Sequence, residues 1–304
     1  MLNDNHNGKV VDSLDGFDVV ECHKCQFKHI MPLPTNKELT QFYSEEYFHY
    51  DKSTYIDEIH EDIEWWELVF NDKYDSFEEL LPKNRRSLLD VGCGYGHFLS
   101  AGEKRGWEVT GIEPSRTAFN YCKKEFNLNV INKVFDNETK TELGFFDVIH
   151  LAFVLEHVRD PYNLLVNVHE KLKPGGLICV EVPNDYNPFQ IALKKSRNFN
   201  PWWVYPTHHI NYFDFGSLGS LLDQVGFKVV LKDATFPIDI FLLMGYNYVN
   251  KNEIGRKCHM SRKNFELNLF KANMNSLKRK IYKSFSELGV GRELIMVASK
   301  REVS

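Results

Sequence analysis

The chain has 304 residues, of which 43% are apolar and 26% are charged, and its formal net charge is −5. This composition fits a globular protein with a sizeable core and excludes a disordered or fibrous chain. No apolar run approaches the roughly 18 residues that a membrane span needs, and the first residues lack the apolar segment of a signal peptide. We therefore expect a cytoplasmic protein without a membrane span.

Charge is unevenly distributed along the chain. Residues 241–304 contain 13 Lys and Arg against 5 Asp and Glu, whereas residues 1–240 are strongly acidic. A basic tail on an acidic body fits an anionic substrate or partner, but we favour the simpler interpretation of a solvated helix face. Because no nucleic-acid recognition motif is present, we do not expect nucleic acid as a partner.

The first motif along the chain is Cys22-x-x-Cys25, which has the spacing of half a zinc knuckle. We expect a metal-free remnant of such a knuckle, with zinc as the alternative. The cysteines are too scattered for a disulfide framework, and Cys93, Cys122 and Cys179 lie in apolar runs typical of buried thiols. The residues that could complete a zinc site are His6, His23, His29 and His60.

From Arg86 onward, short apolar runs alternate with helical stretches. Ser115 and Asp160 stand at helix N-cap positions, and Pro161 follows the second of them. Strands that are apolar on both faces and alternate with helices indicate a parallel sheet covered by helices. The predicted strands are 87–92, 107–114, 128–132, 145–153, 177–184, 227–233 and 293–300, and the predicted helices are 97–106, 115–127, 160–176 and 217–226.

These elements predict an α/β protein with a Rossmann-like, doubly wound, mostly parallel seven-stranded sheet and helices on both faces. In such sheets, ligands bind beyond the carboxyl ends of the strands. Around the core we expect further segments, including an amphipathic helix at EWWELVF (64–70) that packs on the sheet. The expected division is an N-terminal extension (1–40), a helical cap (41–84), a cofactor-binding core (85–240), a basic helical insert (241–290), and a last strand with its tail (291–304).

The stretch DVGCGYG (90–96) carries the clearest chemical information. Three alternate glycines between a buried strand and a helix allow backbone to approach a ligand closely. The third glycine comes one residue too early for a dinucleotide fingerprint, and Asp90 is an unfavourable neighbour for pyrophosphate. Glu113 ends the next strand, where a carboxylate can accept hydrogen bonds from both hydroxyls of a ribose. Together they indicate a nucleoside ligand with a cationic tail.

With these residues the chain resembles the class I S-adenosylmethionine-dependent methyltransferases. The resemblance covers about residues 80–235 and rests on DVGCGYG (90–96), Glu113-Pro114, FDVI (146–149), LEHV (155–158) and KPGG (173–176). Within that class the chain looks most similar to bacterial sugar and natural-product methyltransferases. Many of those carry an N-terminal cysteine knuckle with a second cysteine pair, which this chain lacks.

The resemblance implies S-adenosylmethionine as the cofactor and a set of residues around it. In the aromatic stretch 42–55, Tyr43, Tyr47 or Tyr50 could cap the carboxylate of its methionine part. The implied positions are Asp90, Gly92, Cys93 and Gly94 at the methionine part, Glu113 and Pro114 at the ribose, Val134 and Phe135 at the adenine, and Ala152 and Phe153 at the sulfonium.

Histidines follow two of the strands. His157, next to Glu156 in LEHVRDP, either orients the substrate or holds its loop in place. The stretch THHINYF (207–213) follows a Trp-rich loop that resembles a lid, and the family's His-x-x-Tyr-Phe pattern falls on His209, our candidate general base. We expect His208 to face solvent or to support its neighbour, and Tyr212 and Phe213 to anchor the loop.

The expected function is methyl transfer to a small acceptor, first of all a hydroxyl of a sugar, nucleotide-sugar or surface-polysaccharide precursor. An aromatic natural product or quinone precursor is the alternative acceptor, and a cofactor-binding partner subunit without activity is the alternative to an enzyme. Lys and Arg residues of the 241–290 insert could recognise phosphate on the acceptor, or the insert could form a homodimer contact.

Overall fold

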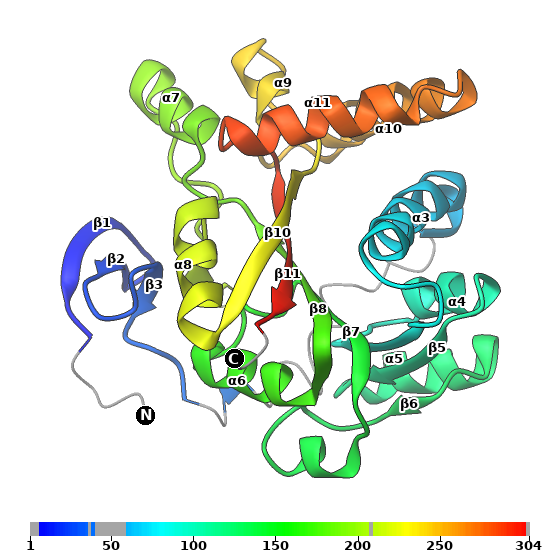
Figure 1. Ribbon diagram of the computed structural model, residues 1–304. Helices are drawn as coiled ribbons and strands as arrows, with labels where there is room; N and C mark the ends of the chain where they lie inside the picture. The colour runs from blue at the N-terminus through cyan, green and yellow to red at the C-terminus, as the bar shows by residue number, and fades with distance from the viewer. Residues whose placement is uncertain (1–5, 36–37, 40–58, 207–208, 302–304) are drawn as a thin grey trace. The chain divides into compact units, whose positions relative to one another are not determined.

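A seven-stranded sheet organises the chain, as Figure 1 shows. The computed structural model describes residues 6–35, 38–39, 59–206 and 209–301. The strand order is β10-β11-β8-β7-β4-β5-β6, and the described strands β4, β5, β6 and β7 pair in parallel. The predicted Rossmann-like α/β fold is confirmed. The strands are β4 (Ser87–Val91), β5 (Glu108–Ile112), β6 (Val130–Ile131), β7 (Phe146–Ala152), β8 (Leu172–Pro183), β10 (Phe227–Ala234) and β11 (Glu293–Lys300).

Two compact units divide the chain. One unit comprises residues 34–180, 222–230 and 297–304, and the other comprises residues 1–33, 181–221 and 231–296. We refer to them as the glycine-loop unit and the histidine-strand unit, after the segments 90–96 and 209–213 that they contain.

The glycine-loop unit holds β4 to β7 and the helices along them. Leu88, Leu89 and Val148 have no solvent exposure, because these strands are covered on both faces. Trp65 is buried on α3, in line with the predicted amphipathic helix, whereas the aromatic stretch 42–55 lies outside the described residues. The helices are α3 (Ile63–Leu80), α4 (His97–Lys104), α5 (Arg116–Tyr121), the π-helix η2 (Cys122–Phe126), the 3-10 helix η3 (Thr139–Glu142) and α6 (Pro161–Lys171).

The predicted helix over 160–176 is too long. Helix α6 starts at Pro161 after the Asp160 cap, as expected, but ends at Lys171, and β8 begins at Leu172. Pro174 is the physical reason, since it has no N–H for a helix and forces the residue before it toward extended backbone. The stretch KPGG (173–176) therefore opens a strand.

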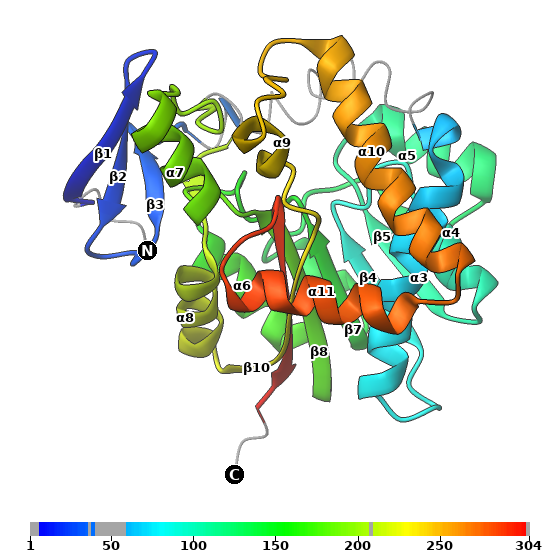
Figure 2. The ribbon, with the colours of Figure 1, turned by 90° about the horizontal axis from the view of Figure 1, so that it is seen from above.

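The histidine-strand unit has its own small sheet, with strand order β1-β2-β3-β9. Asp15 and Gly16 both have positive φ (52° and 84°), which suits the tight turn between β1 and β2. In Figure 2, helices α10 and α11 of the predicted insert meet at an angle near the turn that joins them, and the two helices contact each other. The strands are β1 (Gly8–Leu14), β2 (Phe17–Cys22), β3 (Lys28–Met31) and β9 (Asn211–Tyr212), and the helices are α7 (Pro188–Arg197), α8 (Phe215–Val225, which enters the other unit), α9 (Asp239–Leu243), α10 (Asn252–Lys271) and α11 (Asn275–Glu287).

Among the described residues, no helix combines the length and the apolar character that crossing a membrane requires. All six cysteines are free, and Cys93, Cys122 and Cys179 are buried, as their apolar surroundings in the sequence predict.

Candidate functional site

The glycine loop joins β4 to α4 through three residues with positive φ. The φ angles of Gly92, Gly94 and Gly96 are 73°, 53° and 78°, values that side chains larger than hydrogen disfavour. The N–H groups of Gly92 and Cys93 donate to the carbonyl of Ile112 at 2.8 and 3.1 Å. The loop is thus held against the end of β5, which is followed by Glu113, the residue predicted to bind a ribose.

Glu113 is the residue predicted to bind the ribose, and it is only 3% exposed. One carboxylate oxygen accepts the N–H of Gly94 at 2.9 Å, and the other accepts the N–H of Ser115 at 2.7 Å. Burial raises the pKa of Glu113 to about 7, although these two backbone hydrogen bonds act in the opposite direction. Each carboxylate oxygen keeps a lone pair for a further donor, so the group can still accept two hydroxyls.

Asp90, at the end of β4, is buried beside a residue that sequence reasoning missed. His150 on β7 places Nδ1 2.7 Å from Oδ1 of Asp90, and the two side chains are 3% and 5% exposed. The ring of Phe98 packs on His150 at 4.2 Å between centroids. Parallel pairing explains the contact, because Asp90 and His150 are opposite each other in the β4–β7 register. The polar residue within the otherwise apolar run VIHLAF was the available signal.

The predicted apolar neighbours of the cofactor differ in exposure. Val134 and Phe153 are exposed (49% and 41%), whereas Phe135 is buried and Ala152 is half-buried at the end of β7. Phe153 has a φ of 56°, a conformation that is strained for an aromatic residue and often marks a functional site. Pro114 follows Glu113, and its carbonyl accepts a hydrogen bond from the Asn132 side chain at 2.9 Å.

Cys93 has a packing role. A hydrogen bond with Cys122, together with burial, raises the pKa of the Cys93 thiol well above its usual range. A thiol in that state is a poor nucleophile. Its sulfur fills space beside Gly111, where an added Cβ would lie only 2.7 Å away.

Glu156 and His157 follow β7 within the glycine-loop unit. Glu156 is 1% exposed, and its Oε1 lies 3.7 Å from Nε2 of His157. The N–H of His157 donates to the carbonyl of Val154 at 3.0 Å. Both predicted roles of His157, orienting a substrate and holding the loop, are compatible with this geometry.

His209 belongs to the histidine-strand unit and is half-buried. Its N–H donates to the carbonyl of Tyr205 at 2.8 Å, and the next residue, Ile210, accepts the N–H of Ile30 at 2.9 Å. Tyr212 and Phe213 are 2% and 1% exposed, as expected of residues that anchor the segment. His208 lies outside the described residues.

Cys22 and Cys25 lie at the end of β2 and in the following turn. His6 and His29 come close to them, and the four side chains form one group whose ligand atoms all lie within 4.8 Å of one another. His23, between the two cysteines, is exposed and is not part of this group.

A second feature that the sequence did not reveal is a buried polar cluster after β8. Asp239 has no solvent exposure and accepts hydrogen bonds from Asn187 (3.1 Å) and from the hydroxyl of Tyr248 (3.0 Å). Burial raises the pKa of Asp185 to about 7, although the charge of Arg292, 4.0 Å away, acts in the opposite direction. The stretch NDYN (184–187) reads as an ordinary turn, so its burial could not be predicted locally.

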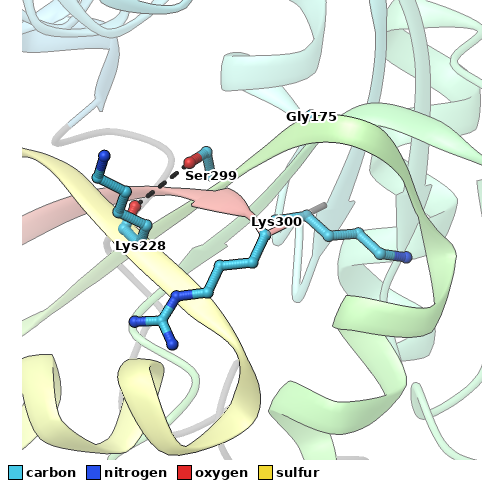
Figure 3. Close-up of a pocket in the computed structure, with 5 residues that line it drawn as sticks. Gly175, Lys228, Ser299 and Lys300 are labelled. Atoms are coloured by element: carbon cyan, nitrogen blue, oxygen red, sulfur yellow. Dashed lines mark hydrogen bonds between the residues drawn. The ribbon is translucent and has the colours of Figure 1, made fainter. Parts of the chain in front are cut away.

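A shallow hollow of about 460 Å³ lies elsewhere, and Figure 3 shows the side chains around it. Two of its cations already have partners: Lys300 donates to the carbonyls of His169 (2.7 Å) and Leu172 (3.0 Å), and Arg301 pairs with Asp223. Gly175 lies near the start of β8, and ligands in such sheets bind at the opposite ends of the strands. This hollow is therefore not the catalytic site.

Comparisons with known proteins agree with the methyltransferase fold. A family model described as "Methyltransferase domain" matches residues 65–232, more than half of the chain. The solved structure of a SAM-dependent methyltransferase from Archaeoglobus fulgidus superposes with a TM-score of 0.50 at 21% identity, over 77% of this chain and 94% of that one. This similarity supports the fold.

Two curated relatives are more similar in sequence but match over a shorter part. A tRNA U34 carboxymethyltransferase from Pseudoalteromonas translucida is 30% identical over 163 residues, which is 50% of this chain and 48% of that protein. A ubiquinone biosynthesis O-methyltransferase from Coxiella burnetii is 32% identical over 111 residues, or 35% of this chain and 47% of that protein. The chain thus spans about half the length of these relatives.

The family model and the fold both agree with the resemblance to methyltransferases seen in the sequence. The chain belongs to the methyltransferase domain family. Its similarity to sugar methyltransferases in particular stays a prediction.

Proposed function

We propose that this protein transfers a methyl group from S-adenosylmethionine to a hydroxyl oxygen of a small acceptor, first of all a sugar or nucleotide-sugar. The observation that carries the proposal is the buried Glu113 carboxylate, held by the N–H groups of Gly94 and Ser115 beside three glycines of positive φ. This arrangement fits a ribose on the carboxylate and a close backbone approach to the rest of the ligand.

In this proposal the chain's own residues hold the cofactor at several points. Glu113 accepts the ribose hydroxyls, and the glycine loop with Asp90 lies against the methionine part. Val134 and Phe153, both exposed apolar side chains, offer surface to the adenine and to the region of the sulfonium. The cofactor, when bound, supplies an electrophilic methyl group, so the difficult chemistry does not depend on a protein nucleophile.

The protein's remaining task is to orient the acceptor and to accept its proton. We assign the proton to His209, because imidazole is the most frequent general base in enzymes and because its segment is well anchored. The backbone of Ile210 is hydrogen-bonded to β3, and Tyr212 and Phe213, further along the segment, are buried. Such anchoring limits the positions that the imidazole can take. Glu156 and His157 are proposed to orient the acceptor.

A phenolic hydroxyl is the second candidate acceptor, as in a quinone precursor. The similarity to the ubiquinone biosynthesis O-methyltransferase favours it, and the same base would serve, since a phenol also loses a proton on methylation. We propose no nucleic acid substrate. Because another relative is a tRNA U34 carboxymethyltransferase, the experiment includes transfer RNA as a competing outcome.

The experiment is an acceptor screen that measures formation of S-adenosylhomocysteine. Purified protein is incubated with S-adenosylmethionine and, separately, with nucleotide-sugars, catechol-type phenols, amines and unmodified tRNA. We expect turnover with a hydroxyl acceptor of the first two classes. Turnover only with amines or with tRNA would contradict the proposed acceptor, and tight cofactor binding without turnover in any arm would favour the partner-subunit alternative.

A further inference from the structure

Four potential metal ligands converge in the histidine-strand unit. Nδ1 of His6 lies 3.1 Å from Nε2 of His29, 3.6 Å from Sγ of Cys22 and 3.3 Å from Sγ of Cys25. All four ligand atoms lie within 4.8 Å of one another. Four donors at such mutual distances surround a single point.

The three distances from His6 are close to those of a tetrahedral zinc site. Zn–S bonds of about 2.3 Å and Zn–N bonds of about 2.0–2.1 Å place tetrahedral ligand atoms about 3.3–3.8 Å apart. We propose that the chain binds one structural Zn²⁺ through His6 Nδ1, Cys22, Cys25 and His29 Nε2. The site is a two-cysteine, two-histidine site, so it does not need the second cysteine pair that the sequence lacks.

The surroundings orient the ligands for a metal. Nδ1 of His29 lies 2.9 Å from the carbonyl oxygen of Ile30, so it carries the proton and leaves the Nε2 lone pair directed at the cluster. The N–H of Cys25 donates to Sγ of Cys22 at 3.4 Å, which stabilises a thiolate. A remnant without metal would have no need for a fixed histidine tautomer beside two thiols.

The backbone also brings the four ligands together. The N–H of Gln26 donates to the carbonyl of Cys22 at 3.0 Å, and Gln26 has a φ of 60°, which closes the turn that contains both cysteines. The N–H of His23 donates to the carbonyl of Asn7 at 3.0 Å and keeps the residue after His6 beside this turn. The ligand from the N-terminal segment is thereby fixed to the end of β2.

The metal would also stabilise the segment that carries the proposed base. His29 is paired with Asn211 in the β3–β9 register, and the N–H of Ile30 donates to the carbonyl of Ile210, the residue after His209. A metal on His29 would hold β3, and β3 holds β9. The effect on turnover rests on the proposed function, whereas the metal site itself does not.

The test compares metal content and backbone protection in matched variants. Wild-type protein, reconstituted anaerobically, is expected to bind about one Zn²⁺ per chain, and Co²⁺ in its place should show the intense visible bands of tetrahedral thiolate coordination. His29→Ala should lose both signals, whereas His29→Cys should keep the metal because it supplies another ligand. His23→Ala is the control, since this exposed neighbour lies outside the cluster.

Hydrogen exchange then reports the link to β9 without any acceptor. Chelation or His29→Ala should speed amide exchange at Ile30 by at least about tenfold, and His29→Cys should restore protection. A wild-type protein that takes up neither metal, or equal metal in His29→Ala and His23→Ala, would overturn the zinc site. Metal binding without a change in exchange would overturn the link to β9. Neither result bears on the proposed methyl transfer, which the acceptor screen tests separately.

Discussion

The glycine loop and the β3–β9 strand pair contribute to the proposed reaction by different physical means. The loop acts through its backbone: Gly92, Gly94 and Gly96 take positive φ so that main chain can approach a ligand. The strand pair acts through side chains, namely His29 on β3 and His209, the proposed base just before β9. Strand β9 is held by β3, which is distant in sequence. A site built from backbone tolerates few residue types at each position, whereas a site built from side chains forms only when segments distant in sequence fold together.

The largest expected effect belongs to His209, which precedes β9 of the β3–β9 strand pair. His209→Ala should lower turnover by about 10²–10⁴-fold, because the acceptor hydroxyl loses its general base. The affinity for S-adenosylmethionine should change less than about twofold, since the proposed cofactor residues lie in the other unit. Steady-state kinetics with the acceptor found by the screen, together with calorimetric cofactor titration, measures both.

His23→Ala serves as the control for His209→Ala, because it removes an exposed histidine of the same unit. The pH profile adds a second reading, since the alanine variant should lose the acidic limb that the base produces. Wild-type turnover in His209→Ala would remove this residue from the mechanism.

The next effect tests the side chain that accepts a hydrogen bond from the glycine loop. Glu113→Gln should weaken cofactor binding by about 10–100-fold, because a hydrogen bond to a charged acceptor contributes about 1.5–3 kcal/mol. The amide NH₂ would also face the N–H of Gly94 or Ser115, which both need an acceptor. Glu108→Gln, an exposed acid at the start of the same strand, should leave the affinity unchanged.

The pH dependence of cofactor binding follows from the same residue. Burial raises the pKa of Glu113 to about 7, and ribose hydroxyls donate to the ionised carboxylate. Affinity should therefore be constant above about pH 7 and fall as the pH drops below it, by up to about tenfold per pH unit. Calorimetry of wild type and Glu113→Gln checks this, and an equally steep fall in the variant would assign the titration to another group.

A smaller effect is expected at the contact that the sequence did not reveal. His150→Leu should leave the buried Asp90 without its donor and weaken cofactor binding by about tenfold, since an unpaired buried group costs about 1–3 kcal/mol. His150→Asn can place an amide N–H near the position of Nδ1 and should recover most of the affinity. If His150 only fills space, the order reverses, and leucine becomes the better replacement in both affinity and melting temperature.

The sequence predicts the glycine loop well because its requirements are local. A run such as SLLDVG followed by alternate glycines specifies strand, turn and helix within a dozen residues, and β4 and α4 appear where expected. The pairing of Asp90 with His150, by contrast, depends on strand register, and the group of His6 and His29 with two cysteines depends on how a turn closes. The predicted end of α6 is wrong because Pro174 does more than end a helix. It also favours extended backbone in the residue before it.

The smallest expected difference in free energy separates two reasons for a glycine at a position of the glycine-loop unit. Gly92 and Gly106 have similar φ (73° and 80°), but a Cβ on Gly92 would lie 2.9 Å from Cγ2 of Val154, whereas one on Gly106 would meet nothing within 4 Å. Backbone strain should cost both alanine variants about 1–2 kcal/mol, and the clash should add about 1 kcal/mol for Gly92→Ala alone. Urea unfolding measures both free energies.

Val154→Ala supplies the decisive comparison, because it removes the atom that the new Cβ would meet. In a double-mutant cycle, Gly92→Ala should cost less in the Val154→Ala background by about the size of the clash, whereas Gly106→Ala should cost the same in both. A cycle with no coupling would mean that Gly92 is needed for its φ alone. The close packing of the loop against the residues after β7 would then contribute nothing to its stability.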